Sequence, residues 1–353
     1  MERIRAIDLA RGIAVVLMIL SHGIKGLVPF EEFPSWGLVP LHLLTKGAST
    51  CFFLVFGMTL AVAFVPAIDR DDWPKKRKRL FFRGLKILFW YKVLCIVEMF
   101  SLYERQEIID VLLYRAFAVY SEILGFYGIA LLWIPFFLPL WKKLRGWGQL
   151  LSIAVTTYIA IFLFNNFDFG SVGLKALLVE HEDFYTWGQL TRLPIVMIGL
   201  MLGEVVRRSY DSIRKRMILS ASLFAGGILL AVAFVLHSPE NLQETLMALA
   251  MNEGKHPPDA SFMLFSISLT LFIVSLSLAG GNLLALVLKP VTIIGSDALG
   301  AFIFHICVIF VFYRYLFDYW HKITYQHALN LTLLLILLTA IWIRVKNWVS
   351  QES

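Results

Sequence analysis

Charged residues are scarce in this sequence. They make up 16% of its 353 residues, against 59% that are hydrophobic, whereas a soluble domain carries about 25% charged residues. The mean hydropathy of +0.74 is far above the soluble range, and no polar segment is long enough to fold separately. The composition therefore excludes a soluble protein and predicts one transmembrane domain over residues 1–353.

Cysteines and the common cofactor motifs are also few or missing. Cys51, Cys95 and Cys307 lie inside apolar runs without metal-like spacing, which excludes a disulfide framework and a zinc site. The sequence has no GxGxxG, P-loop or HExxH pattern and no repeat with a period of 20–50 residues. We therefore expect no metal cofactor.

Ten stretches are apolar enough to cross a bilayer, whose hydrocarbon core needs about 20 residues per helix. The sequence thus predicts an all-α polytopic membrane protein, a single bundle of about ten transmembrane helices in contact with lipid. The segment 107–120 is apolar on one face only and is predicted to be an interfacial or re-entrant helix. The predicted spans are 9–28, 41–66, 84–102, 121–141, 149–165, 191–206, 217–237, 260–279, 291–316 and 328–344.

The lysines and arginines predict the orientation, because cytoplasmic loops of membrane proteins retain cations. With the N-terminus in the cytoplasm, 22 of the 32 lysines and arginines fall on inner segments. The net charge of +7 is therefore a topology signal, and no nucleic-acid partner is expected. Both termini are predicted to be cytoplasmic. No A-x-A-like cleavage site follows the first helix, which we expect to stay attached.

The first predicted span carries ionisable residues that share one face. Such groups are costly at membrane depth and usually face the bundle interior or a water-filled cavity. Arg11 and His22 are eleven residues apart, within about 20° of three whole helical turns, and about 16 Å along the axis. Asp8 and Lys25 lie near the same stripe. One interpretation is structural: Asp8 and Arg11 form an ion pair that anchors the helix end. The other is functional: these residues line a water-filled path.

Other spans contribute further polar groups. His42 and Lys46 have i, i+4 spacing in the second span, and His305 lies in the ninth. Histidine titrates near neutrality, which suits proton transfer to and from a reacting group. In the external segment NEGKHPPD, residues 252–259, two prolines predict a stiff connection that holds Lys255 and His256 at the membrane surface. A simple turn is the alternative interpretation.

Two further patterns in the sequence predict contacts between helices. Lys92 and Glu98 in the third span are expected to form ion pairs with neighbouring helices, because a charge at membrane depth needs compensation. Gly199 and Gly203 form a GxxxG pattern in the sixth span, which predicts close helix packing.

The opening RAIDLARGIA, residues 5–14, with MILSH at 18–22, resembles the first helix of the transmembrane acyltransferase superfamily. Arg11 and His22 reproduce the R-x10-H spacing of its acyltransferase-3 branch. Other motifs resemble the branch that contains heparan-alpha-glucosaminide N-acetyltransferase and its bacterial relatives, although residues 30–36 lack the histidine that the animal enzyme has in its first lumenal loop. These motifs are FFLVFG at 52–57, LPIVMIGLMLG at 193–203, KHPP at 255–258 and IGSDALGAFIFH at 294–305.

The resemblance implies transfer of an acyl group, most simply acetyl, from cytoplasmic acyl-CoA to a hydroxyl or amine of a sugar or glycan across the bacterial inner membrane. It implies His22 as general base, with Arg11 positioning the donor, Asp8 orienting Arg11, and His305 as a supporting or alternative acid/base. The acceptor side would be lined by His42, Lys46, Lys255 and His256. The CoA phosphates would be held by Arg77, Arg79 and Arg83. These cations are explained equally well by a role in setting membrane topology and in contacting anionic lipid.

A second class of function fits the same residues. Intramembrane histidines and Lys46 also suit a proton-coupled transporter of a small polar solute, although the spans show no inverted repeat. Direct transfer and a covalent acyl-histidine intermediate require the same imidazole, so both stay open. A homo-oligomer is compatible with the sequence.

Overall fold

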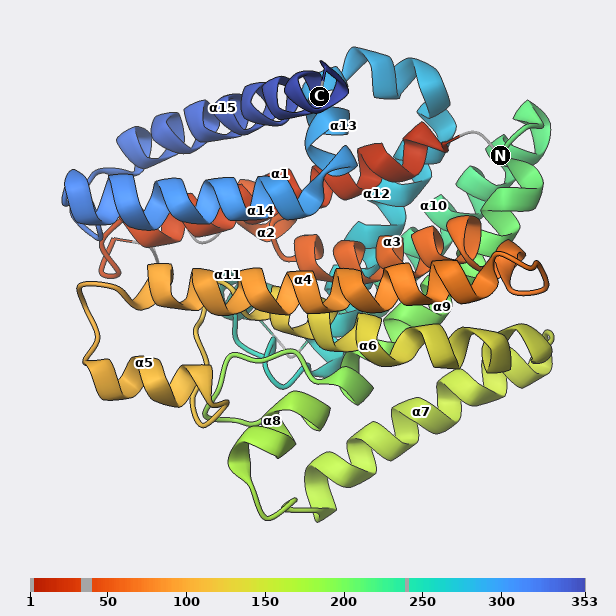
Figure 1. Ribbon diagram of the computed structural model, residues 1–353, viewed down its shortest axis with the longest axis horizontal. Helices are drawn as coiled ribbons and strands as arrows, with labels where there is room; N and C mark the ends of the chain where they lie inside the picture. The colour runs from red at the N-terminus through yellow and green to blue at the C-terminus, as the bar shows by residue number, and fades with distance from the viewer. Residues whose placement is uncertain (1–2, 33–39, 239–240, 353) are drawn as a thin grey trace. The chain divides into compact units, whose positions relative to one another are not determined.

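The structure is a computed structural model that describes residues 3–32, 40–238 and 241–352 (Figure 1). Residues 33–36, in the loop where the sequence departs from the animal enzyme, lie outside these ranges. The regular elements of the described residues are helices. Contacts divide the chain into two compact units, residues 1–52 with 209–353 and residues 53–208. The single domain over residues 1–353 stays a prediction.

The first unit is built around α1 (Arg5–Leu27), which packs against α12, α13, α14 and α15. Glycines allow the close approach of α1 and α13: a side chain at Gly12 would meet the Val291 carbonyl, and one at Gly295 would meet the Asp8 carbonyl. The other elements of this unit are α2 (Pro40–Leu44), the start of α3 (Gly47–Ala63), α10 (Ile213–His237), α11 (Leu242–Ala250), α12 (Ala260–Val287), α13 (Lys289–Ser296), α14 (Ala298–Cys307), the π-helix η3 (Val308–Leu316) and α15 (Tyr325–Glu352).

The second unit contains the rest of α3 and the elements up to α9. Gly199 and Gly203 of α9 lie against Leu54 and Met58 of α3, so the close packing predicted from the GxxxG pattern is confirmed. The elements are η2 (Val65–Ala67), α4 (Trp73–Met99), α5 (Arg105–Leu112), α6 (Glu122–Lys143), α7 (Trp147–Asn166), α8 (Val172–Val179) and α9 (Gln189–Ser209).

A buried ion pair holds the segment before α9 in place. The Arg192 guanidinium donates from Nε to Glu180 Oε1 over 2.7 Å and from Nη2 to Oε2 over 3.2 Å, and both residues are fully buried. Two parallel hydrogen bonds of this kind fix a carboxylate and a guanidinium in one orientation. The pair therefore ties the connection after α8 to the start of α9.

Nine helices within the described ranges are long and apolar enough to cross a membrane, which confirms an all-α polytopic membrane protein. One span prediction stays a prediction and another needs correction. The third, 84–102, falls in the 27-residue α4, which is not among the nine because Arg83, Lys86, Lys92 and Glu98 interrupt its apolar run. The ninth, 291–316, is broken at Asp297, so the apolar helix begins at Ala298.

The polar residues of the third span are satisfied by backbone groups, and the predicted ion pairs are wrong. Lys92 Nζ donates to the Val111 carbonyl over 2.9 Å. The buried Glu98 carboxylate accepts the backbone N–H groups of residues 119–121 over 2.7–3.0 Å. These bonds hold the residues that follow α5. The helix predicted over 107–120 is shorter in the structure than predicted, because α5 ends at Leu112.

Candidate active site

The N-terminal end of α1 carries a carboxylate between two guanidinium groups. Asp8 is buried; its Oδ2 accepts from Arg3 Nε over 2.5 Å and its Oδ1 from Arg11 Nη1 over 3.3 Å. Arg11 Nη1 also donates to the Gly295 carbonyl over 3.0 Å. The hydrogen bond to Asp8 raises the pKa of the Arg3 guanidinium, so this side chain stays charged. The predicted pair between Asp8 and Arg11 is present, and its backbone contact joins α1 to α13.

Three turns along α1, the structure brings together two of the predicted histidines. His22 Nδ1 lies 3.2 Å from His305 Nε2, and the two rings stack with centroids 5.4 Å apart and planes inclined by 25°. His305 is fully buried on α14, whereas His22 is half-buried. The second ring nitrogen of His305, Nδ1, lies 2.9 Å from the Ala301 carbonyl of its own helix.

These contacts fix the proton positions when both rings are neutral. A carbonyl oxygen can only accept, so His305 Nδ1 carries a proton and donates it to Ala301. A neutral ring with a proton on Nδ1 has a lone pair on Nε2, so His305 Nε2 accepts from His22 Nδ1. His22 Nε2 is therefore the nitrogen that holds the lone pair. The arrangement directs the basic atom of His22 away from His305, as a general base requires.

Two lysines converge near the C-terminal end of α1. Lys46 Nζ donates to the Ala250 carbonyl over 2.8 Å and to Asn252 Oδ1 over 2.6 Å, and Lys25 Nζ donates to the same Ala250 carbonyl over 3.2 Å. Ala250 is the last residue of α11, where helix carbonyls lack intrahelical partners and carry partial negative charge. This helix end therefore holds two amines together in a site where Lys46 is buried.

The other residues predicted for the acceptor side come from neighbouring segments. Lys255 and Lys25 are close enough to His22 for their charges to act on it. His42 is buried, and its ring contacts the Tyr325 ring with centroids 5.4 Å apart. His256 is half-buried in the series of turns before α12. The structure thus places His22, His305, Lys25, Lys46 and Lys255 in one cluster of basic residues.

The predicted CoA-binding arginines belong to the chain's second unit. Arg77, Arg79 and Arg83 are exposed along α4. The Arg77 guanidinium lies over the Phe136 ring, 5.4 Å from its centroid. All three are exposed cations of the same helix, α4.

Sequence reasoning placed Lys25 on the polar face of the first span without assigning it to the site, and it missed other contacts made by α1 and its neighbours. Lys25 follows His22 by three residues, a helical spacing that puts both on one face and that signals a shared site. Asn252 precedes the predicted Lys255 in the same loop. The Ala250 carbonyl and the Arg3 contact have no sequence signal, because both depend on how separate helices pack.

A comparison with protein families identifies the type of protein. The model of the acyltransferase-3 family, described as an acyltransferase domain, matches residues 4–345. The chain belongs to the acyltransferase-3 family. It is thus a multi-pass membrane acyltransferase. The comparison with curated proteins found no match. In this acyltransferase-3 protein, the matched region includes Arg11, His22 and His305 together.

Proposed function

We propose that this acyltransferase-3 protein transfers an acyl group, most simply acetyl, from cytoplasmic acyl-CoA to a hydroxyl or amine of a sugar or glycan on the extracytoplasmic side of a bacterial inner membrane. The observation that carries the proposal is the hydrogen bond from His22 to His305. It gives the half-buried His22 a lone pair on Nε2 and a fixed ring orientation. Membership of the acyltransferase-3 family favours transfer over proton-coupled transport.

The proposed reaction uses His22 as general base. His22 Nε2 accepts the proton of the acceptor hydroxyl or amine as its oxygen or nitrogen attacks the thioester carbonyl. The tetrahedral intermediate then loses the CoA thiolate, which takes the proton from His22 and leaves as the free thiol. The products are the acylated sugar and CoA, and both histidines return to their starting state. The imidazolium that forms during the attack is hydrogen-bonded by His305.

Charged groups at the two ends of α1 support the two substrates. Asp8 holds Arg11 for contact with the donor. We assign Arg77, Arg79 and Arg83 of α4 to the CoA phosphates, which guanidinium groups bind well. At the outer end, Lys46, Lys255, His42 and His256 line the acceptor side. Cations near the reacting carbonyl favour the negative charge that develops on its oxygen.

The test is transfer by the full-length protein in liposomes, with acetyl-CoA supplied at the face predicted to be cytoplasmic and a mixture of neutral and amino sugars at the other. Free CoA thiol and acetylated sugar are measured together. His22→Ala should lower both rates by about 10²- to 10⁴-fold, the usual contribution of general-base catalysis.

His327→Ala is the matched control, since His327 is an exposed histidine at the start of α15. It should retain the wild-type rate. Unchanged transfer by a His22→Ala protein that elutes as wild type in gel filtration would remove His22 from the mechanism. Solute flux without any acetylated sugar would replace the proposal with transport.

A further inference from the structure

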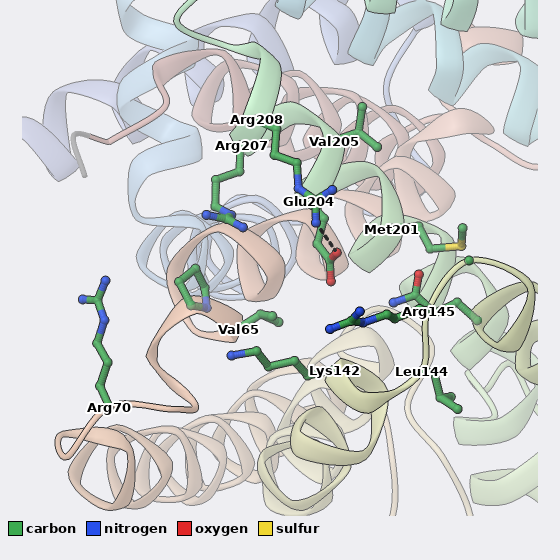
Figure 2. Close-up of a pocket in the computed structure, with 13 residues that line it drawn as sticks. Val65, Arg70, Lys142, Leu144, Arg145, Met201, Glu204, Val205, Arg207 and Arg208 are labelled. Carbon is green, nitrogen blue, oxygen red and sulfur yellow. Dashed lines mark ion pairs between the residues drawn. The ribbon is translucent and has the colours of Figure 1, made fainter.

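A second polar site lies in the other unit of the chain. A cavity of about 760 Å³ is formed by the ends of α6, α7 and α9 and by the segment after α3. This size is within the usual range for small-ligand sites, about 300–1,000 Å³. Figure 2 shows the side chains of Lys142, Arg145, Arg207 and Arg208 around the opening, with Arg70 at its edge.

The lining has a large excess of positive charge. It contains five cations and a single carboxylate, Glu204, which pairs with Arg208 over 3.7 Å. Lys142 pairs with Asp69, which is not part of the lining. Arg70, Arg145 and Arg207 make no ion pair with any residue in the described ranges. Three guanidinium groups thus share one cavity without an ion pair to any described residue.

The helix ends around the cavity do not cancel this charge. The C-terminal ends of α6 and α9 each contribute about half a negative charge, and the N-terminal end of α7 contributes about half a positive charge. With Asp69 counted against Lys142, an excess of about 2.5 positive charges remains. Arg207 Nε is also buried without a hydrogen-bond partner among the described residues, and a buried donor of this kind is costly until it is satisfied.

Topology alone does not explain the arrangement. Basic residues at helix ends mark the cytoplasmic face, but that role requires only a location near the membrane surface. Lys143 fulfils that topological role although it is exposed and lies outside the cavity lining. Gathering five cations around one opening adds mutual repulsion, which a bound anion relieves.

We propose that this cavity binds a phosphate-bearing group at the predicted cytoplasmic face, with Arg145 and Arg207 as its main ligands. Guanidinium groups match phosphate oxygens in charge and in bidentate geometry. The phosphate belongs either to a soluble nucleotide, such as the one within CoA, or to an anionic lipid headgroup. The inference does not depend on acyl transfer. Only a soluble nucleotide ligand would link this cavity to the proposed acyl-CoA donor.

The experiment measures binding to the full-length protein in nanodiscs. Adenosine 3′,5′-bisphosphate is titrated in phosphatidylcholine nanodiscs, with adenosine as the phosphate-free probe, and phosphatidylglycerol retention is measured by native mass spectrometry. In the Arg145→Gln/Arg207→Gln variant, one of the two phosphate probes should bind about tenfold more weakly or worse, because charge-assisted hydrogen bonds are lost. Loss of bisphosphate binding identifies the soluble source, and loss of phosphatidylglycerol identifies the lipid.

The matched control is Lys75→Gln/Lys143→Gln, which removes two exposed cations outside the lining. It should bind both probes as wild type does. Equal loss in the control and the cavity variant would overturn the proposal, as would unchanged binding of both probes in the cavity variant or no binding to wild type. His22→Ala should bind the probes normally, so failure of this site and failure of the proposed reaction are separate results.

Discussion

At the scale of single residues, the direction of the hydrogen bond between two imidazoles decides which one takes up a proton. Ala301 fixes the tautomer of His305, and His305 fixes that of His22. In the proposed reaction, His305 would therefore act through His22, as a positioning residue. The spacing of charged groups on α1 predicted the face that contains His22. It did not predict the pairing with a residue 283 positions away, because that contact depends on the packing of α14.

A substitution series at His305 tests this relay. His305→Ala removes the acceptor for His22 Nδ1–H and should lower kcat about tenfold or more, since a hydrogen bond to an imidazolium is worth about 1.5–3 kcal/mol. His305→Gln offers an amide oxygen near the position of Nε2 and should recover part of that loss. KM for acetyl-CoA should change little in both variants, and steady-state kinetics in liposomes measures the two constants. Equal rates for Ala and Gln would indicate that His305 serves only to fill space.

At the scale of helices, α1 and α13 are held together by backbone contact as well as by Arg11. Gly295 lies against the Asp8 carbonyl, where a methyl group would overlap the oxygen, and the Gly295 carbonyl accepts from Arg11. Gly295→Ala should therefore separate the helices, weaken the Arg11 contact and destabilise the fold by about 1–3 kcal/mol, the usual cost of overpacking. A lower apparent Tm in thermal unfolding by intrinsic fluorescence would show this.

Gly226→Ala is the control for this change. A methyl group at Gly226 in α10 meets only Leu271, at an ordinary 3.4 Å. Alanine also has a higher helix propensity than glycine, so the apparent Tm should stay level or rise. A Gly295→Ala protein as stable as wild type would show that α1 and α13 tolerate a wider separation than their contacts indicate.

Helix existence was predictable for most of the chain, whereas helix limits and breaks were not. Apolar length identifies α6, α10 and α15 directly, because lipid offers no partner for polar side chains. The break at Asp297 is a local event: its side chain accepts the Gly300 N–H as the N-cap of α14 and pairs with Lys346 Nζ over 2.6 Å. Hydropathy averaged over a window does not detect a cap of this kind.

At the scale of the whole molecule, the two candidate sites require a defined orientation. Both depend on the prediction that the cation-rich helix ends face the cytoplasm. The prediction that both termini are cytoplasmic requires an even number of crossings, which the nine apolar helices provide together with α4. The charges in the outer half of α4 have backbone partners in the residues after α5, which lowers the cost of placing them at membrane depth.

Cysteine labelling from one side of the membrane tests this orientation. In a chain with Cys51, Cys95 and Cys307 replaced by alanine, single cysteines are introduced by Lys75→Cys and Gln106→Cys, before and after most of α4, and by Lys143→Cys at the end of α6. A membrane-impermeable maleimide added to intact cells should label only the Gln106→Cys protein, and cell lysis should make the other two reactive, because α4 and α6 then cross in opposite directions. If the cysteines at 75 and 106 react from the same side, α4 does not cross, the termini lie on opposite faces, and the assignment of the basic cavity to the cytoplasm is wrong.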